Sequence, residues 1–401
     1  MRILPVVLFA LIFSRGIFEL LGSKILGYAF GLTSVFLLVC VSLSEGFKYR
    51  KSIRIPLDFT FITFLIYSIF VFLSLFATVL NNIPILVGLL YSSLHIFFLG
   101  SLVMTKRNSG LTFNTLSAMI TVVSGIIIVS GLLEFFDIVS FPAESEFGGF
   151  ARLVGSLGSK QHFSFASASL GMIALWFFLE SQRKYMLFLS IVLVALTFLS
   201  FSRNGMPIVF GTLLLNFFGD FKTSLIKMWK PVFATVLGLI TFVFMLSQNN
   251  NLSAAIIQRF FSIFILDSPG NAGRVDAWER GINIFSQGLI VIGNNTGLFS
   301  QAGSRLGLGQ TYHFESAVLQ QFANFGLIGG TAFVLFFTCL CFSFKDVYLR
   351  SLAIMTSLTY VYYPGSESIP FIGAWVAICF CECSKYGLVG YPRTSKNRFD
   401  C

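Results

Sequence analysis

Charged residues are scarce in this chain of 401 residues. Asp, Glu, Lys and Arg together make up only 11% of it, whereas hydrophobic residues make up 56%, and the mean hydropathy is +0.84. A soluble domain carries roughly 25% charged residues, so this scarcity excludes a soluble globular chain. The composition is that of a protein that crosses a membrane several times.

Side chains that bind metals are also few. The chain has 3 histidines and 7 cysteines. Its densest cysteine run, CFCEC from Cys379 to Cys383, spaces the cysteines two residues apart, which is not the spacing of a zinc site. These cysteines are interpreted as small buried apolar side chains. No disulfide framework, metal or other cofactor is expected.

Long apolar runs account for most of the sequence. Runs of about 17 to 25 apolar residues can cross the hydrocarbon core as helices, and twelve runs of mainly apolar residues qualify. They lie near 3–20, 25–43, 57–80, 83–104, 113–134, 162–180, 185–201, 205–219, 231–247, 315–342, 351–364 and 369–384. The predicted fold class is all-α: a polytopic integral membrane protein of about 12 transmembrane helices, with residues 1–401 as a single transmembrane domain.

The basic residues predict an orientation in the membrane. If both termini are cytoplasmic, 18 of the 27 Lys and Arg residues lie in cytoplasmic segments and 9 lie on the other side. This excess satisfies the positive-inside rule, so the net charge of +10 needs no nucleic-acid partner to explain it. The nine external basic residues are Arg15, Lys24, Arg152, Lys160, Arg203, Arg259, Arg274, Arg280 and Arg305.

Two segments outside the membrane, 135–161 and 248–314, are longer than a simple connection. Loops beyond about 15 residues are usually functional or disordered. Within the second, AGRVDAWERGINIF predicts an amphipathic helix in the membrane interface. Its apolar side chains at helical spacing are Val275, Trp278, Ile282 and Phe285.

Four short motifs follow one another between about residues 150 and 330. In chain order they are ARLVGSLGSKQHFSFA, SFSRNG, AGRVDAWERGINIF and ESAVLQQFANFGLIGG. Together, in this order and on one predicted face, they resemble the motifs of the O-antigen polymerase (Wzy) and O-antigen ligase (WaaL) superfamily of bacterial envelope glycosyltransferases. The helices on either side match this superfamily only in hydropathy.

The last motif separates the two branches of the superfamily. The ligases carry a histidine, then Asn, Ser or Gln, then nine residues, then G-x-x-G. Counting back from Gly326 and Gly329 places Glu315 at the histidine position. Ser316 follows it, and His313 stands two residues upstream. The chain is therefore more similar to a polymerase than to a ligase. Gly326, Gly329 and Gly330 are also interpreted as sites of close helix packing.

The resemblance implies a GT-C-like, metal-independent, inverting glycosyltransferase of lipopolysaccharide biosynthesis. It would transfer a growing glycan from undecaprenyl pyrophosphate to a lipid-linked repeat unit, at the periplasmic face of the bacterial inner (cytoplasmic) membrane. The implied partners are the undecaprenyl-pyrophosphate-linked oligosaccharide, membrane lipids and a chain-length regulator, with no nucleic acid. The external segments 135–161 and 248–314 would form the active-site face.

The expected site residues combine the motif positions with the charge of the leaving group. Negative charge rises on the pyrophosphate as the C1–O bond breaks, and arginine offers five donors in a planar fork that suits phosphate. The expected catalytic residues are Glu315, His313, Arg203 and Arg274. The expected substrate-binding residues are Arg152, Lys160, His162, Arg280 and Arg305.

Several alternatives stay open at this stage. An O-antigen ligase that acts on the lipid A core, and a polysaccharide flippase or transporter, fit the same hydropathy. A transporter is expected to carry polar groups near mid-bilayer in both halves, whereas the unexplained charges here gather in one external zone. Arg203 also fits a role as partner of a headgroup phosphate, and Arg274 as partner of Asp276. Glu315 suits a helix N-terminus, and His95 is expected to hydrogen-bond to a neighbouring helix.

Overall fold

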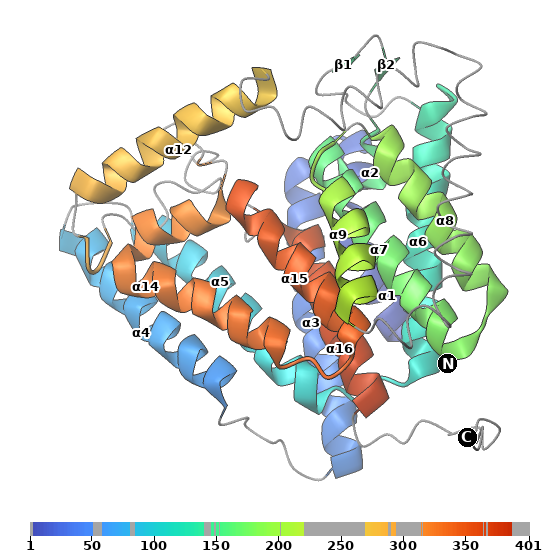
Figure 1. Ribbon diagram of the computed structural model, residues 1–401, viewed down its shortest axis with the longest axis horizontal. Helices are drawn as coiled ribbons and strands as arrows, with labels where there is room; N and C mark the ends of the chain where they lie inside the picture. The colour runs from blue at the N-terminus through green and yellow to red at the C-terminus, as the bar shows by residue number, and fades with distance from the viewer. Residues whose placement is uncertain are drawn as a thin grey trace.

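The computed structural model describes residues 3–50, 58–80, 85–139, 146–147, 150–151, 153–200, 202–219, 269–287, 290–293, 314, 316–363, 365 and 368–386. These residues form a helical bundle (Figure 1). The helices are α1 (Ile3–Ile12), α2 (Arg15–Leu20), α3 (Lys24–Arg50), α4 (Phe59–Leu80), α5 (Ile85–Asn108), α6 (Phe113–Phe135), η1 (Gly155–Leu157), α7 (Lys160–Ser181), α8 (Lys184–Leu199), α9 (Met206–Gly219), α12 (Pro269–Gln287), α14 (Ala317–Phe342), α15 (Val347–Tyr362) and α16 (Ile369–Tyr386). One antiparallel pair of two-residue strands joins them, β1 (Glu146–Phe147) and β2 (Phe150–Ala151).

The lengths and hydropathies of the helices are those of a polytopic membrane protein. Within the described residues, seven helices are long and apolar enough to cross a membrane: α3, α4, α5, α6, α7, α14 and α16. Three shorter helices, α1, α8 and α9, are also apolar. The count of twelve spans stays a prediction, because the expected span at 231–247 lies outside the described residues.

The prediction of one continuous span at 3–20 is wrong. Helix α1 ends at Ile12, and α2 begins at Arg15. At the break, the Ser14 hydroxyl donates a hydrogen bond to the Leu11 carbonyl, 2.8 Å away. The break places Arg15 at the start of α2, where its guanidinium finds the polar partners that a charge in an apolar run needs. These are Glu19 of the same helix, 2.8 Å from Nε to Oε1, and His162 of α7, 3.5 Å from Nη1 to Nδ1.

Two helices form the centre of the bundle. Every residue of α7 from His162 to Phe177 is buried, as is every residue of α16 from Ile369 to Ser384. Small side chains on α7 let its neighbours approach closely. A Cβ atom on Gly171, for example, would lie 3.2 Å from Cβ of Leu193 in α8.

One end of the bundle, drawn at the bottom of Figure 1, is called the lower end here. Basic residues lie at or just after the ends of α5, α7 and α14. The Arg107 guanidinium contacts Asp58 at 2.5 Å and so joins the end of α5 to the start of α4. Arg183, after α7, donates to Asn114 of α6 at 2.9 Å. Lys345 follows α14. All three basic residues belong to segments that the charge pattern assigns to the cytoplasm.

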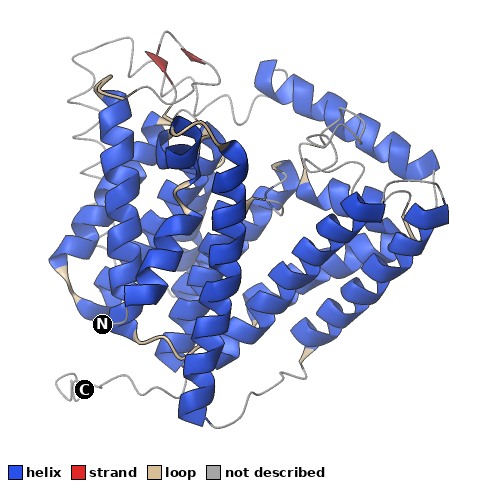
Figure 2. Ribbon diagram, turned by 180° about the vertical axis from the view of Figure 1, so that it is seen from behind, coloured by secondary structure: helices blue, strands red, loops and turns tan. Residues whose placement is uncertain are grey.

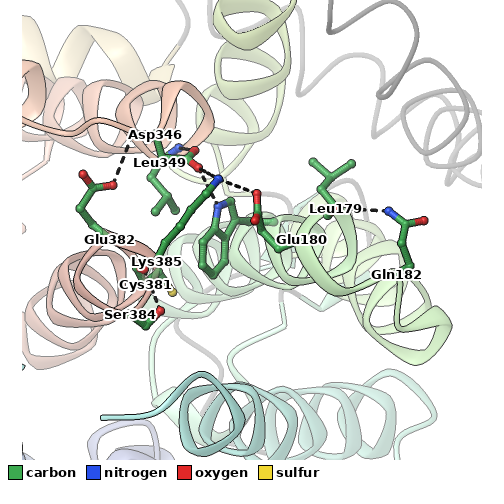
Figure 3. A network of polar contacts seen from close by, with 10 residues as sticks. Leu179, Glu180, Gln182, Asp346, Leu349, Cys381, Glu382, Ser384 and Lys385 are labelled. Atoms are coloured by element: carbon green, nitrogen blue, oxygen red, sulfur yellow. Dashed lines mark hydrogen bonds and ion pairs between the residues drawn. The ribbon is translucent and has the colours of Figure 1, made fainter. Parts of the chain in front are cut away.

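A network of ion pairs ties three helices together at the lower end (Figure 3). Lys385 Nζ lies 2.6 Å from Glu180 Oε1 and 2.6 Å from Asp346 Oδ2. The Trp176 indole donates to the same Asp346 oxygen at 3.3 Å. Glu382 accepts a hydrogen bond from the Lys345 backbone N–H at 2.6 Å. The network fixes the end of α7 against the start of α15 and the end of α16.

The opposite end, called the upper end, carries α2, the two strands and α12; the strands and α12 are seen at the same end from behind in Figure 2. Arg15, Lys160, Arg203, Arg274 and Arg280 lie in or beside elements of this end. The described helices therefore separate the basic residues into the two groups that the charge pattern predicts. Which end faces the cytoplasm stays a prediction.

Helix α14 is interrupted at Gly326, where φ is 70° and ψ is −172°. Gly326 does permit close packing, as interpreted, but against residues 290–293, which are not helical. Residues 290–293 lie against the break, where the Leu327 N–H donates a hydrogen bond to the Ile290 carbonyl at 2.7 Å. A Cβ atom on Gly326 would lie 2.4 Å from the Val291 carbonyl oxygen, so only glycine fits both the conformation and the space.

Candidate active site

Two of the sequence motifs meet at the upper end. In the turn between α8 and α9, the Gly205 N–H donates to the Ser164 hydroxyl at 3.1 Å, and this hydroxyl donates to the Ser202 carbonyl at 3.2 Å. A Cβ atom on Gly205 would lie 2.4 Å from the Ser164 carbonyl oxygen. A larger residue there would push the turn away from α7. The glycine of SFSRNG therefore fixes the turn 202–205 against the first turns of α7.

The turn carries Arg203 and Asn204, both buried, with exposed fractions of 4% and 0%. Among the described residues, neither Oδ1 nor Nδ2 of Asn204 has a hydrogen-bond partner. A buried amide without partners costs about 1 to 3 kcal/mol, and such a group in a native fold calls for an explanation. Helix α9 begins at the next residue but one, and the N–H groups that open a helix favour anions. An anionic ligand at this turn would accept hydrogen bonds from Asn204 Nδ2 and from the Arg203 guanidinium, whereas Asn204 Oδ1 needs a donor such as a sugar hydroxyl.

His162 lies in the first turn of α7, two residues after Lys160, and is 5% exposed. Its Nδ1 atom lies 3.5 Å from Nη1 of Arg15. A guanidinium only donates hydrogen bonds, so Nδ1 is the acceptor and the proton of the neutral ring is on Nε2. Arg15 in turn lies 4.3 Å from the Tyr28 ring centroid and is held by Glu19.

Arg15 and Glu19 are site residues that the sequence analysis missed. Arg15 was expected on the external side, but with no role in the site. The available signal was the pair itself, since an arginine and a glutamate four residues apart interrupt an otherwise apolar run. The contact to His162 could not be read from spacing, because it joins residues far apart in the chain.

The final part of the expected loop 135–161 is fixed in place. The Glu134 carboxylate of α6 accepts hydrogen bonds from the Val154 and Gly155 N–H groups at 2.7 and 2.8 Å. Ser130 accepts another from Ser156 N–H at 3.0 Å. A Cβ atom on Gly158 would lie 2.4 Å from Glu19 Oε2, so α2 also packs against this segment. Residues 154–158 are thus held against α6 and α2, close to His162 in the chain.

Arg274 lies on α12, the helix that the third motif predicts. Its guanidinium interacts electrostatically with the hydroxyl of Tyr362, the last residue of α15. The next residue, Tyr363, places its ring centroid 6.2 Å from that of His162. Contacts therefore join the turn that carries Arg203, through α7, to the end of α15, where the charge of Arg274 also acts.

The expected helix of the third motif is confirmed, but its apolar stripe is only partly correct. The buried positions of α12 are Ala277 and Gly281, whereas Ile282 is 54% exposed. The Phe285 ring centroid lies 6.0 Å from that of Phe322 in α14. Helix α12 therefore contacts α14 through Phe285, while the small residue Gly281 packs against Phe314, just before α14. Arg280 lies on its exposed side.

Four expected site residues lie outside the described residues: Arg152, Arg305, His313 and Glu315. The neighbours of Glu315 are described. Phe314 is 1% exposed and packs against Gly281 of α12. Ser316 is the N-cap of α14, since its hydroxyl accepts from Leu319 N–H at 3.2 Å.

Polar side chains of the fourth motif form a buried network with α4 and α5. Gln321 accepts a hydrogen bond from the Tyr67 hydroxyl at 2.7 Å and contacts Nε2 of His95 at 3.0 Å. His95 Nδ1 contacts the Tyr91 carbonyl at 2.9 Å, so Nδ1 carries the proton and Nε2 accepts. The expectation that His95 bonds to a neighbouring helix is confirmed. The network holds α14 in place beneath the site.

The upper end thus gathers cations from four elements: Arg15 of α2, Lys160 of α7, Arg203 of the turn and Arg274 of α12. Glu19 and Glu134 of this end are engaged in the contacts above, and the carboxylates of α12, Asp276 and Glu279, lie on its exposed side. Such a site suits a ligand with several negative charges, because guanidinium groups bind phosphate oxygens in pairs. No protein-family model matches this sequence, and neither a curated protein nor a solved structure is similar to it.

Proposed function

We propose that this protein is a polymerase of a lipid-linked surface glycan, with its active site at the upper end of the bundle on the periplasmic face of the bacterial inner membrane. The observation that carries the proposal is the packing of the SFSRNG turn, which carries Arg203, against the first turns of α7, which carry Lys160 and His162. It supports a site for a pyrophosphate leaving group, because both segments belong to motifs that resemble those of O-antigen polymerases.

The proposed reaction exchanges one bond to the anomeric carbon for another. The hydroxyl oxygen of the acceptor sugar attacks C1 of the donor, and the bond from C1 to the pyrophosphate oxygen breaks with its electron pair on the pyrophosphate. The acceptor proton passes to a base, for which Glu315 is the first candidate and His313 the second. Arg203 and Arg274 stabilise the charge that develops on the leaving group. The side chains of the site supply this stabilisation, so the reaction needs no metal.

His162 suits a role in holding the substrate. Its Nδ1 accepts from Arg15, so the ring offers a donor at Nε2, the kind of group that binds a phosphate or sugar oxygen. Lys160 adds a charge from the same helical turn. The GT-C-like architecture and the twelve spans belong to this proposal as well.

Deletion of the gene tests the function directly. Surface polysaccharide and lipid-linked intermediates are separated on a gel, with the wild-type gene on a plasmid as control. A polymerase predicts surface glycans of a single repeat unit in the deletion strain. Long polymer that remains lipid-linked would instead indicate a ligase, and complete loss of external glycan a flippase. Either of these two results contradicts the proposal.

A further inference from the structure

Two glycines from different parts of the chain meet at the break in α14. Gly293, which follows α12, has a φ of 89°, and Gly326 has a φ of 70°. A Cβ atom on Gly293 would lie 2.3 Å from the Asn324 carbonyl oxygen, and a Cβ atom on Gly326 would lie 2.5 Å from the Gly293 backbone nitrogen. At both positions, therefore, only glycine fits the conformation and the space.

A backbone hydrogen bond closes the same contact. The Leu327 N–H, next to the break, donates to the Ile290 carbonyl at 2.7 Å. The interruption of α14 thereby supplies both the space and the hydrogen-bond donor that residues 290–293 need. The contact between residues 290–293 and residues 326–327 is called the latch here.

Two further contacts attach the second half of α12. The Phe285 ring lies against that of Phe322 in α14, with centroids 6.0 Å apart. A Cβ atom on Gly281 would lie 3.0 Å from the Phe314 ring. Ala277, one turn earlier on the same face of α12, is 5% exposed. This half of the helix is therefore held close to α14, and the latch follows directly after it.

The first half of α12 extends beyond these contacts. A Cβ atom on Gly273 would meet no atom within 4 Å, and Asp276 is exposed. Arg274 lies in this half, seven residues before Gly281, which is about 10 Å along an α-helix. The position of the Arg274 backbone therefore depends on how the second half of the helix is attached.

We infer that Gly293 and Gly326 are positioning residues: the latch that they form holds α12 against α14 and so places Arg274 at the site. The task of Arg274 in the reaction rests on the proposed function, whereas the latch does not. The glycine at which the fourth motif interrupts its helix thereby gains a role in the placement of the third motif.

Cysteine labelling tests the latch without measuring transfer. Ala277→Cys places a thiol on the attached face of α12, and Glu279→Cys places one on its exposed side. The purified full-length protein in detergent is treated with a water-soluble maleimide, and the protein without an added cysteine gives the background from native cysteines. We expect slow labelling at position 277 and fast labelling at position 279.

Gly293→Ala should raise the labelling rate at position 277 at least about fivefold, the factor expected from forcing a side chain into this backbone region. The rate at position 279 should not change. Gly273→Ala is the matched control and should change neither rate, because its added Cβ meets no atom. An unchanged rate at position 277 in Gly293→Ala would overturn the latch. Faster labelling of the buried native cysteines would overturn it as well, because it would show that the whole bundle opens.

A disulfide tests the positioning role. Gly281→Cys combined with Phe314→Cys should form one, since a Cβ atom at position 281 lies 3.6 Å from Phe314 Cγ. In the Gly293→Ala protein, oxidation of this pair should raise the polymerisation rate at least about fivefold, because the disulfide replaces the attachment that the latch has lost. A rate that oxidation leaves unchanged would overturn the positioning role.

The two readouts separate this inference from the proposed function. A deletion strain that keeps its polymer would refute the proposed function and the task of Arg274, while the labelling rates would still decide the latch. Loss of polymer on deletion, with an unchanged labelling rate at position 277 in Gly293→Ala, would refute the latch alone.

Discussion

Nη1 of Arg15 lies 3.5 Å from Nδ1 of His162, and the same guanidinium is paired with Glu19 at 2.7 Å. The exposed fractions of the Arg15 and Glu19 side chains are 11% and 3%. An ion pair within α2 thus holds the guanidinium whose hydrogen bond to the first turn of α7 sets the orientation of the only described histidine that the site contains.

This arrangement predicts that the single variant Arg15→Met is less stable than a double variant that also replaces Glu19. Arg15→Met should lower the free energy of unfolding by about 3 to 5 kcal/mol, because it leaves the Glu19 charge buried without its partner. Arg15→Met combined with Glu19→Leu should recover most of this loss. Thermal unfolding of the detergent-solubilised variants measures both. A double variant no more stable than the single one would show that the pair is not the main contribution of Arg15.

A second prediction concerns the break in α14. Gly326→Ala should destabilise the protein by at least about 1 to 3 kcal/mol, the usual cost of forcing a side chain into a disfavoured backbone conformation. The clash with the Val291 carbonyl adds to this cost. Gly125→Ala in α6 is the matched control, since no atom lies within 4 Å of its added Cβ. Equal unfolding temperatures for the two variants would contradict the role of Gly326.

Most helix positions could be predicted from the sequence, because the bilayer requires apolar runs of fixed length. The span expected at 57–80 is helical from Phe59 to Leu80, and that expected at 113–134 from Phe113 to Phe135. The run at 3–20 was predicted incorrectly as one span because its charged residues, Arg15 and Glu19, find partners within the protein. Hydropathy measures how apolar a segment is and contains no information on such partners.

The candidate site was predictable only in part. The motifs named Arg203, Arg274 and His162, but their convergence depends on contacts between helices far apart in the chain. The turn 202–205 lies against α7 because the Ser164 hydroxyl bonds to both Gly205 and Ser202. Asn204 belongs to the SFSRNG motif, but only the packed structure shows that its side-chain amide has no hydrogen-bond partner among the described residues. No periodicity in the sequence carries that information.

A third prediction concerns the two arginines assigned to pyrophosphate. Arg203→Ala and Arg274→Ala should each abolish polymer, since loss of a buried charge-assisted contact typically costs about 2 to 5 kcal/mol. Lysine should restore little activity, because a point charge lacks the planar fork. Arg183→Ala at the lower end is the control and should leave chain length unchanged. Normal polymer in either alanine variant, at equal expression on gels, would exclude a pyrophosphate role for that residue.

A fourth prediction separates the two candidate bases. Glu315→Gln should lower the rate of polymerisation by at least about 10²-fold, the lower end of what general-base assistance contributes. His313→Ala should have a smaller effect, because only Glu315 is in register with Gly326 and Gly329. Purified protein and lipid-linked repeat units give the rates. A fully active glutamine variant beside an inactive His313 variant would reverse the assignment.

The last prediction uses the buried amide of Asn204. In the absence of ligand, Asn204→Ala removes two polar atoms that have no hydrogen bonds among the described residues, so the unfolding temperature should stay the same or rise. Activity should fall about 10-fold to 100-fold, because a hydrogen bond to a charged group contributes about 1.5 to 3 kcal/mol. Asn204→Asp should be worse for activity than alanine, since its carboxylate would repel phosphate and pair with Arg203. A structural role for Asn204 predicts the reverse pattern, in which stability and activity fall together in the alanine variant. Parallel measurement of unfolding temperature and polymerisation rate therefore decides between ligand binding and packing.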